Sequence, residues 1–339
     1  MNSAPDEAEG RTRPPLVRVG IVSWNTASLL DDCLKALPAA LGSLEAEVVV
    51  VDNASSDSSV DVAEAHAARV IRNEINLGYA RAMNQAITNS EADVLIALNP
   101  DTRPEPGSLE NLVCCLVDGP PDVGLVVPVL VNPDGSLQHS VRRFPSIRLY
   151  AVVWFVPYFL HRGRLARRFW LEGRAPHDRA EDIDWGIGAV HVIRSSALAG
   201  SAPYDERWFM YVEDLDLCWQ LAERGWRRRL EPTARVVHVG NAAGSQAWGR
   251  RRFRVYMEAS YSWYERQYGP WAMRAWAMLN VVGTAWWVAR YIFFSVLRRR
   301  GLDRIRYGFW QFRDEVPVHA RAVLSVPRVD WCERVETHD

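Results

Sequence analysis

The sequence has few cysteines and little net charge, and each shortage excludes a class of protein. Its 339 residues contain five cysteines, an odd number with no Cys-x-x-Cys pair. This argues against a disulfide framework and a structural zinc site, and it fits a reducing cytosol. The formal net charge of -1 provides no overall field to attract nucleic acid, so we expect no nucleic-acid partner. Internal repeats and low-complexity tracts are also lacking.

The first residues lack the apolar core of a signal peptide. Residues 1–15 are polar and end in Pro14-Pro15, so we expect a disordered N-terminus. Together with the few cysteines, this favours a cytoplasmic protein.

What the sequence does contain is a series of short apolar runs that end in polar residues. The clearest is Val94–Leu98, which is followed by Asn99, Pro100 and Asp101. An unbroken apolar run rich in branched residues is typical of a strand buried on both faces. Proline cannot donate to a ladder, so the strand ends there and Asp101 lies just past its carboxyl end. Ligands of open α/β sheets bind at that edge, although a turn aspartate is the simpler interpretation of Asp101 alone.

Strand and helix patterns alternate through the first 120 residues. This alternation predicts an α/β fold with a mostly parallel central sheet flanked by helices. The expected strands are 17–24, 47–51, 70–72 and 94–101, and the expected helices are 29–41, about 58–69 and 79–89.

The pattern changes after about residue 122. Strands at 123–131 and 136–141 are expected to form a hairpin, and 142–182 reads as irregular and basic. Further expected elements are a strand at 185–193, a helix at 213–224, a strand at 234–239 and a helical C-terminal region.

Seven short motifs in this framework resemble those of the inverting family 2 glycosyltransferases of the GT-A fold, and within them the bacterial rhamnosyltransferase-like branch. The resemblance covers roughly residues 17–268 and implies a catalytic domain at 16–268. We expect a helical, membrane-associating region at 269–339 to follow it. The motifs are Ile21–Asn25, Val50–Asp57, Asn76–Ala80 with Asn84, Leu98–Asp101, Trp185–Ala189, Phe209–Cys218 and Val237-His238.

The resemblance implies that a nucleotide-diphosphate sugar is the donor substrate. Asp52 would accept a hydrogen bond from the imide of a uracil or thymine base, although it could instead cap the next helix. The residues expected to bind the donor are Ser23, Asn25, Asp52, Asn53, Asn76, Gly78, Asn84 and Asn99.

A divalent cation, Mg²⁺ or Mn²⁺, is implied at the family's DxD position. Here Asn99 replaces the first aspartate, which leaves Asp101 as the main ligand and removes one anionic ligand from the site. Mg²⁺ uses one or two carboxylates together with phosphates and waters, so the site remains plausible. His238 resembles the family's later metal or diphosphate contact, although a structural role is equally open.

The acidic cluster Glu213-Asp214-Leu215-Asp216 is the strongest catalytic signal. Inverting transfer needs a carboxylate that takes the proton of the acceptor hydroxyl, and the resemblance identifies it as Asp214. Trp185, Gly188 and Glu213 are expected to bind the acceptor, and Asp216 is expected to be structural. The alternative is that these carboxylates only stabilise a helix N-terminus.

The function implied by the resemblance is transfer of a sugar, with dTDP-L-rhamnose as the expected donor. The expected acceptor is a glycan or a polyprenyl-diphosphate-linked sugar in cell-envelope polysaccharide assembly. UDP-galactofuranose and UDP-GlcNAc remain alternative donors. A nucleotidyltransferase would need a Gly-rich, basic loop after the first strand, which Asn25–Ser28 is not. A catalytically inactive sugar-binding subunit is disfavoured by the presence of both Asp101 and Asp214.

The segment Trp271–Leu297 is apolar and is followed by Arg298-Arg299-Arg300. Its tryptophans and flanking arginines are typical of helices at a membrane surface. We expect these helices to lie on the inner membrane surface, which makes the protein peripheral on the cytoplasmic face. A helix buried against the catalytic domain and a true membrane span are the alternatives. Arg290 within the segment makes a span costly.

Overall fold

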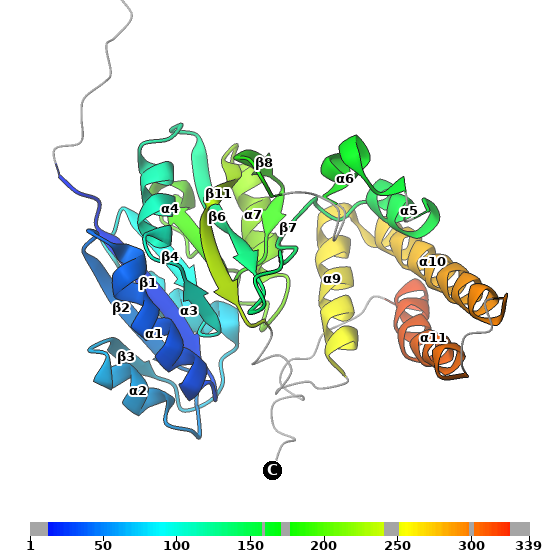
Figure 1. Ribbon diagram of the computed structural model, residues 1–339, viewed down its shortest axis with the longest axis horizontal. Coiled ribbons are helices and arrows are strands. Elements are labelled where there is room, and N and C mark those ends of the chain that lie inside the picture. The colour runs from blue at the N-terminus through cyan, green and yellow to red at the C-terminus, as the bar shows by residue number, and fades with distance from the viewer. Residues whose placement is uncertain (1–12, 158–159, 171–176, 241–250, 298–301, 326–339) are drawn as a thin grey trace, which may run out of the picture.

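The computed structural model describes residues 13–157, 160–170, 177–240, 251–297 and 302–325. Figure 1 shows a mixed sheet flanked by helices, with a group of C-terminal helices beside it. Of the predicted disordered N-terminus, residues 1–12 lie outside the described residues. Arg13 is described and pairs with Asp93 at 3.1 Å.

The N-terminal half alternates between strand and helix, as predicted. Its strands are β1 (Val17–Ser23), β2 (Ala46–Asp52), β3 (Arg69–Arg72), β4 (Val94–Leu98) and β5 (Thr102–Pro104). Its helices are α1 (Ala27–Leu41), α2 (Ser59–Ala65), α3 (Tyr79–Ile87) and α4 (Ser108–Val117).

The central strands are apolar on both sides because helices cover both faces of the sheet. In β4, Ile96 and Leu98 pack in a cluster with α1 and α4. Leu95 and Ala97 point the other way, into a cluster with α3 and α7 (Glu213–Glu223). This two-sided burial is the physical reason for the unbroken apolar runs.

The strands follow the order β3-β2-β1-β4-β10-β6-β11-β5, and β8 (Glu181–Ile183) pairs with β11. The parallel pairs β1–β2, β1–β4, β2–β3 and β6–β11 make up most of the paired length, which confirms the mostly parallel sheet. Three strands depart from the parallel pattern: β10 (Val190–Arg194) runs antiparallel between β4 and β6 (Val123–Val131), and β5 and β8 each pair antiparallel with β11. β11 (Arg227–His238) begins seven residues earlier than expected, and it ends at His238.

Three predictions about the middle of the chain were wrong in detail. Residues 136–141 make only an isolated bridge to β6, and β7 (Val141–Arg142) instead pairs with β9 (Trp185–Gly186) in a separate two-stranded sheet. The expected strand at 185–193 is therefore divided into β9 and β10. The break between them has a physical cause, because the Gly188 N–H donates to Asp214 Oδ2 rather than to a neighbouring strand. The region expected to be irregular contains two helices, α5 (Ile147–Phe155) and α6 (Gly163–Phe169).

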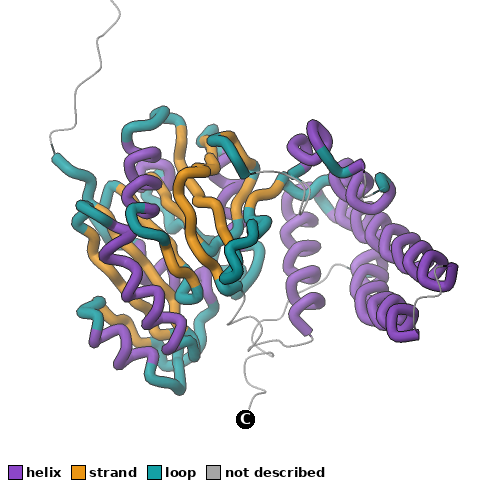
Figure 2. The backbone as a smooth tube through the Cα atoms, in the orientation of Figure 1, coloured by secondary structure: helices purple, strands orange, loops and turns teal. Residues whose placement is uncertain are grey.

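The C-terminal region is helical, as predicted, and consists of α9 (Arg252–Tyr268), α10 (Pro270–Leu297) and α11 (Leu302–Leu324). Figure 2 shows the strands gathered in one part of the molecule and α5, α9, α10 and α11 in the other.

A buried chain of hydrogen bonds holds these four helices together. Trp154 Nε1 of α5 donates to Asn280 Oδ1 of α10 at 2.9 Å, and Asn280 Nδ2 donates to the Tyr261 hydroxyl of α9, also at 2.9 Å. That hydroxyl lies 2.8 Å from His319 Nδ1 of α11. Gly283 lets α5 approach α10 closely, since a Cβ there would lie 2.2 Å from the Trp154 ring. Because buried polar groups are costly unless paired, this network specifies one arrangement of the four helices.

Candidate active site

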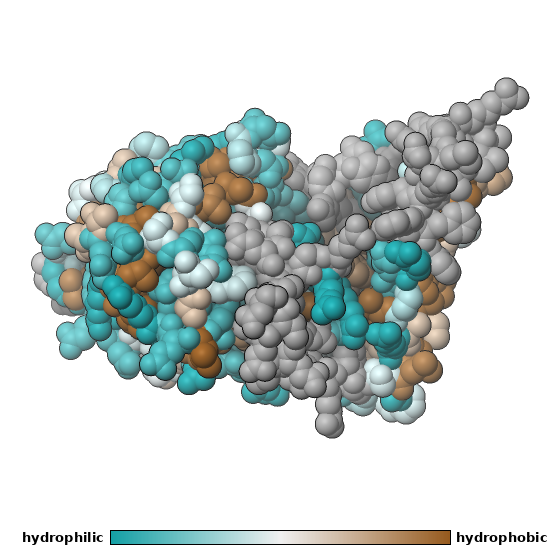
Figure 3. Space-filling view, turned by 90° about the horizontal axis from the view of Figure 1, so that it is seen from below, coloured by the Kyte–Doolittle hydropathy of each residue, from teal (hydrophilic) through white to brown (hydrophobic). Residues whose placement is uncertain are grey.

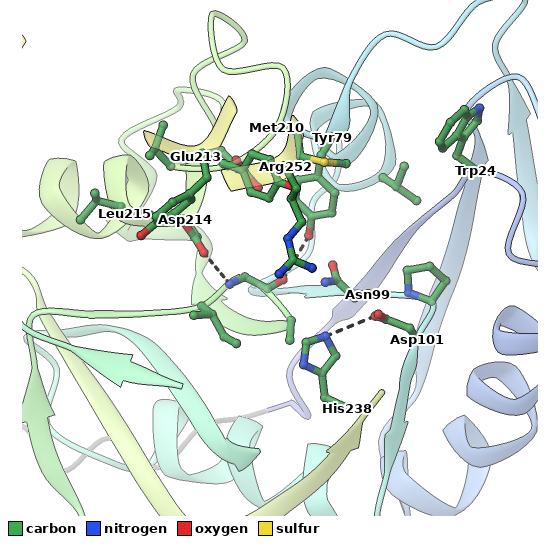
Figure 4. Close-up of a pocket in the computed structure, with 18 of the residues that line it drawn as sticks. Trp24, Tyr79, Asn99, Asp101, Met210, Glu213, Asp214, Leu215, His238 and Arg252 are labelled. Atoms are coloured by element: carbon green, nitrogen blue, oxygen red, sulfur yellow. Dashed lines mark hydrogen bonds and ion pairs between the residues drawn. The ribbon is translucent and has the colours of Figure 1, made fainter. Parts of the chain in front are cut away.

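A pocket of about 500 Å³ opens at the carboxyl ends of β1, β2 and β4. It extends from the β1–α1 loop, past Asp101 and the start of α7, to the first turns of α9 (Figure 4). Nine of the predicted site residues line it, which are Asn53, Asn76, Asn99, Asp101, Trp185, Gly188, Glu213, Asp214 and His238.

Two residues predicted to bind the donor instead build the loops beneath the pocket. The Ser23 hydroxyl is fully buried and bonds to those of Thr26 and Ser59. The Asn25 carboxamide accepts from the backbone N–H of Ser56. These bonds join the loop after β1 to the loop after β2, so Ser23 and Asn25 shape the site without lining it.

Gly78 and Asn84 likewise make close contacts within the protein. A Cβ on Gly78 would lie 2.6 Å from the Phe209 carbonyl, and the φ of +81° also favours glycine. Asn84 is buried, and its carboxamide makes two hydrogen bonds to the backbone of Tyr204. Both residues hold α3 against the segment that precedes α7, and neither lines the pocket.

Asp52 lies at the end of β2, beside the pocket rather than in its lining. Its Oδ2 accepts a 3.2 Å hydrogen bond from the Ser55 N–H. Its Oδ1 is buried and has no hydrogen-bond partner among the described residues. Asp57 performs the alternative capping role, because it accepts from the Ser59 and Ala27 backbones at the starts of α2 and α1. Asp52 Oδ1 is thus a buried acceptor at the edge of the site that makes no hydrogen bond within the described structure.

The neighbouring Asn53 and Asn76 bond to each other, with Asn53 Nδ2 donating to Asn76 Oδ1 at 2.8 Å. Asn53 Oδ1 in turn accepts from the Leu77 N–H and from the Asn73 carboxamide. This network fixes the turn that leads into α3 at the edge of the pocket.

Asp101 and His238 come from distant parts of the chain and meet because β5 pairs with the end of β11. His238 Nε2 lies 3.4 Å from Asp101 Oδ1, and both side chains are buried. On the other side of the ring, Nδ1 lies 2.6 Å from Gln138 Oε1. Gln138 Nε2 bonds to Asn132 Oδ1, which supports this orientation of the amide.

This geometry fits a bound cation. Gln138 Oε1 can only accept a hydrogen bond, so the His238 imidazole donates from Nδ1. In a neutral ring the lone pair of Nε2 then points at the Asp101 carboxylate. Two electron-rich atoms facing each other require a proton or a metal ion between them. The Asn99 carboxamide oxygen, also buried and without a hydrogen-bond partner among the described residues, lines the same part of the pocket. No group of three or more His, Cys, Asp or Glu side chains with metal-binding geometry occurs in the described part of the chain. A cation here would therefore depend on ligand oxygens as well.

Asp214 lies on the opposite side of the pocket, in the first turn of α7 (Figure 4). Its Oδ2 accepts from the Gly188 N–H at 2.9 Å, and its Oδ1 accepts from the Leu215 N–H at 2.7 Å. A Cβ on Gly188 would lie 3.3 Å from the Cβ of Asp214, so this close approach favours glycine. Trp185 lines the same side and donates from Nε1 to the Arg143 carbonyl. The predicted acceptor residues are thus gathered around Asp214.

Burial raises the pKa of both acidic groups at the start of α7. The pKa of Glu213 is raised well above its usual range by burial and by the charge of Asp214. The pKa of Asp214 is raised by burial, and this rise is opposed by His191 and by the two backbone N–H donors. Asp214 has bonds that stabilise a negative charge, whereas Glu213 Oε2 is buried without a hydrogen-bond partner in the described structure. Asp214 is therefore the member of the pair that is better suited to carry a charge.

Asp216 has a structural role, as expected. Its Oδ1 accepts from Trp263 Nε1 of α9 at 2.9 Å, and its Oδ2 accepts from Gln220 Nε2 at 2.8 Å. It thereby ties the helix that carries Asp214 to the helix that closes the pocket.

Sequence analysis missed several residues that line the pocket. Arg252, Phe253 and Tyr256 come from the first turns of α9, and Arg142 comes from β7. Tyr211 precedes α7 in a left-handed conformation, with φ of 68°, and its ring meets that of Tyr256 edge to face. Arg142 stood out only as the start of a basic stretch, and no local pattern indicates that α9 returns to the pocket.

The order of the strands, the pocket at their carboxyl ends and the placement of the carboxylates define a glycosyltransferase of the GT-A fold. A mannosyltransferase from Pyrobaculum calidifontis has a similar structure, with a TM-score of 0.56 over 92% of this chain and 88% of the other. The two chains are 17% identical, so this likeness establishes the fold alone.

Residues 18–178, slightly less than half of the chain, match the profile of glycosyl transferase family 2. The chain is 30% identical over 204 residues to an N-acetylglucosaminyl-diphospho-decaprenol L-rhamnosyltransferase of Mycobacterium tuberculosis, an alignment that covers 56% of this chain and 66% of the relative. It is also 31% identical over 195 residues to a pre-mycofactocin glycosyltransferase of the same species, across 56% of this chain and 37% of that protein. The chain thus spans slightly less than two thirds of the first relative and about a third of the second.

Proposed function

We propose that this protein is an inverting glycosyltransferase that moves a sugar from a nucleotide-diphosphate donor to a glycan or lipid-linked acceptor in envelope polysaccharide assembly. The observation that carries the proposal is that Asp214 and the Asp101–His238 pair occupy opposite sides of one pocket (Figure 4). Inverting transfer needs this separation, because the acceptor must attack from the face opposite to the departing diphosphate.

In this proposal each side of the pocket has its own task. Asp214 accepts the proton of the acceptor hydroxyl, and the Gly188 and Leu215 N–H groups hold its carboxylate in position. Asp101, His238 and Asn99 would hold a divalent cation, Mg²⁺ or Mn²⁺, which supplies Lewis-acid stabilisation of the departing diphosphate when bound. The structure of the Pyrobaculum mannosyltransferase contains GDP-mannose and Mn²⁺, which supports this use of the fold. Asp52 Oδ1 accepts the N–H of a pyrimidine base.

The proposed donor is dTDP-L-rhamnose, in line with the name of the mycobacterial relative. A thermal-shift screen of dTDP, UDP and GDP sugars with Mn²⁺ tests this, because a ligand that binds only the folded state raises the melting temperature. We expect dTDP-rhamnose at about 100 times its Kd to stabilise the protein by ~2.7 kcal/mol and GDP sugars to have no effect. A larger increase in melting temperature with UDP-galactofuranose or UDP-GlcNAc would identify that nucleotide sugar as the donor instead. If no nucleotide sugar raises the melting temperature, the proposal is contradicted.

The C-terminal helices suggest where the protein works. α10 has one face that is apolar along its length and exposed, and Figure 3 shows apolar side chains gathered at this end of the molecule. Seven exposed positions on this face recur every three or four residues, and they are Trp271, Ala275, Met278, Val282, Trp286, Ala289 and Phe293. We refer to these seven residues as the α10 stripe. The opposite face is packed against the protein and includes Trp276, Asn280 and Thr284.

This two-sided character favours a helix that lies on a membrane surface. Residues Pro270–Phe294 are long and apolar enough to span a bilayer, yet Asn280 on the packed face bonds to α5 and α9. A helix that buries one face in protein and offers the other to solvent is suited to insert that face between lipid headgroups. The catalytic domain would then work at the cytoplasmic face of the cell membrane, where nucleotide sugars are made. Arg298–Arg300, expected to strengthen this binding, lie outside the described residues.

Substituting Met278→Glu and Trp286→Glu together should strongly weaken vesicle binding. The two side chains are 48% and 53% exposed, so the fold should tolerate the change. Losing two large apolar contacts should lower partitioning at least ~10-fold. The measurement is flotation with anionic and neutral liposomes, with Ile75→Glu as a matched control, because Ile75 is 67% exposed on the catalytic domain. Wild type should float with anionic liposomes and be released by high salt. Salt-resistant binding would instead indicate a span, and failure of the wild type to float would contradict membrane association.

A further inference from the structure

His191 is a polar residue in the apolar core of the sheet. It lies in β10 between Val190 and Val192, and its side chain is completely buried. In the ladder it stands opposite Ala97 of β4, and the side chains of paired residues point to the same face of a sheet. Ala97 packs in the cluster that contains residues of α3 and α7, so the imidazole points toward the helix that carries Asp214. An imidazole is costly in such a place unless its nitrogens are paired.

Both nitrogens of the ring have a partner. Nε2 lies 2.9 Å from the Gly186 carbonyl oxygen, and Nδ1 lies 3.2 Å from the Tyr204 hydroxyl. Because a carbonyl oxygen can only accept, Nε2 carries the proton and Nδ1 accepts from the hydroxyl. Burial lowers the pKa of His191, which favours this neutral form. Tyr204 is itself fixed, since its backbone makes two hydrogen bonds to the Asn84 carboxamide.

Gly186 begins the turn that brings Gly188 to the Asp214 carboxylate. The Ile187 N–H donates to the Ser140 carbonyl at 2.9 Å. The next N–H, that of Gly188, donates to Asp214 Oδ2, also at 2.9 Å. Two of these three consecutive residues are glycines, which have the greatest backbone freedom. The direction of the Gly188 N–H therefore depends on bonds that hold the turn from outside, and the imidazole provides one of them at the Gly186 carbonyl.

Building on the proposed role of Asp214 as the base, we infer that His191 is a positioning residue for it. The imidazole holds the Gly186 carbonyl, and the turn then directs the Gly188 N–H at the carboxylate. His191 is not among the residues that line the pocket, so it acts on the base and not on a substrate. A hydrogen bond to the charged form of a carboxyl favours that form, so loss of the imidazole N–H should raise the pKa of Asp214.

Several other titratable groups lie near Asp214, and their effects must be separated from that of the histidine. They are Glu213 and Cys218 of α7, Tyr79 of α3, Tyr204 of the segment before α7, and Arg142 of β7. Burial raises the pKa of Cys218 to about 12 and the pKa of both tyrosines well above their usual range, so these three groups stay neutral. Glu213 is an adjacent acid whose titration would mix with that of Asp214, so the measurement needs a Glu213→Gln background.

The test measures the pKa of Asp214 in the full chain by NMR titration of isotope-labelled aspartate carboxyls, with Glu213→Gln in every sample. The Asp214 signal is assigned by its loss in Asp214→Asn. In His191→Asn the carboxamide occupies the position of Nδ1 and is too short to reach the Gly186 carbonyl. The pKa of Asp214 should then rise by about one pH unit, the order expected when a charged group loses one hydrogen bond. In His191→Gln the longer side chain places an N–H at the position of Nε2, so the pKa should return to its value with His191.

Two further measurements serve as controls. Tyr204→Phe removes the other partner of the ring and leaves the bond to Gly186, so it should not change the pKa of Asp214. NMR spectra of isotope-labelled histidines in the wild type should show His191 protonated at Nε2 alone, with its signals assigned by their loss in His191→Gln. If His191→Asn fails to fold, His191→Leu takes its place with the same expected rise, since it fills a similar space without a donor.

Four outcomes would overturn the inference. They are an unchanged pKa of Asp214 in His191→Asn, an equal rise in His191→Asn and His191→Gln, a rise of the same size in Tyr204→Phe, and a proton on Nδ1 of His191. The last would mean that the ring is charged or has the other tautomer. None of these measurements needs a substrate. The proposed function fails if the wild type binds no nucleotide sugar, whereas the titration would still show whether His191 acts on Asp214.

Discussion

Asp214→Asn is expected to lower kcat by ~10²–10⁴-fold while leaving the Kd for the donor nucleotide unchanged. Asparagine has nearly the same size and shape, and its carboxamide oxygen can still accept one of the two N–H bonds from Gly188 and Leu215. What is lost is the ability to accept a proton as the acceptor hydroxyl attacks. Initial rates with donor and lipid-linked acceptor, together with dTDP titrations, separate the two effects. A variant within a few-fold of wild type would contradict the role of Asp214.

Glu213→Gln provides the comparison for this experiment. Glu213 is buried beside Asp214, and its raised pKa favours the neutral form, which glutamine imitates. We therefore expect a smaller loss of kcat than for Asp214→Asn. Because burial also raises the pKa of Asp214, the acid limb of the kcat profile should lie above the usual range of an aspartate, with activity rising as the base loses its proton. Equal losses in the two variants would mean that the pair acts jointly and that the base is not Asp214 alone.

The parts of the fold that the sequence predicted well are those with a strong local cause. β4 is apolar on both faces and is followed by Pro100, so its position and the location of Asp101 follow from the pattern of residues. The acidic start of α7 was equally visible. The antiparallel direction of β10 could not be predicted. The direction depends on the neighbouring strands β4 and β6, and the residues 190–194 themselves do not indicate it.

The donor site shows a different limit of prediction. Motif resemblance identified Ser23, Gly78 and Asn84. It could not, however, distinguish residues that contact a ligand from residues that position the ligand-binding loops. In the structure these three residues make close contacts within the protein. A polar residue in a motif can be needed for either reason, and only the direction of the side chain distinguishes them.

The far side of the pocket was missed because it is built from distant segments. Arg252 and Tyr256 reach it only because Asp216 binds Trp263 and the helical network positions α9. Those contacts join residues that are too far apart in the sequence for any periodic pattern to relate them. The consequence is that the C-terminal helices complete the pocket, and they are expected to matter for substrate binding as well as for membrane contact.

Asp101→Asn is expected to weaken metal-dependent binding of dTDP by ~10²-fold or more, since metal–phosphate contacts supply several kcal/mol. The carboxylate faces His238 Nε2 at 3.4 Å, and its replacement removes the only anionic group of the pair. Because Asn99 and a neutral His238 carry no charge, the cation site of this variant would have no protein charge to balance a divalent cation. Hard cations bind poorly to such a set.

Calorimetric titration of dTDP with Mn²⁺ and with excess chelator measures this effect without requiring turnover. Wild type should lose affinity when the metal is removed, whereas Asp101→Asn should bind dTDP weakly under both conditions. Asp134→Asn is the matched control, because Asp134 is an exposed turn carboxylate that bonds to Ser136 outside the pocket. If wild-type affinity is unchanged by chelator, the metal role of Asp101 is wrong. Neutralisation of the diphosphate would then fall to Arg252, which lies on the same side of the pocket (Figure 4).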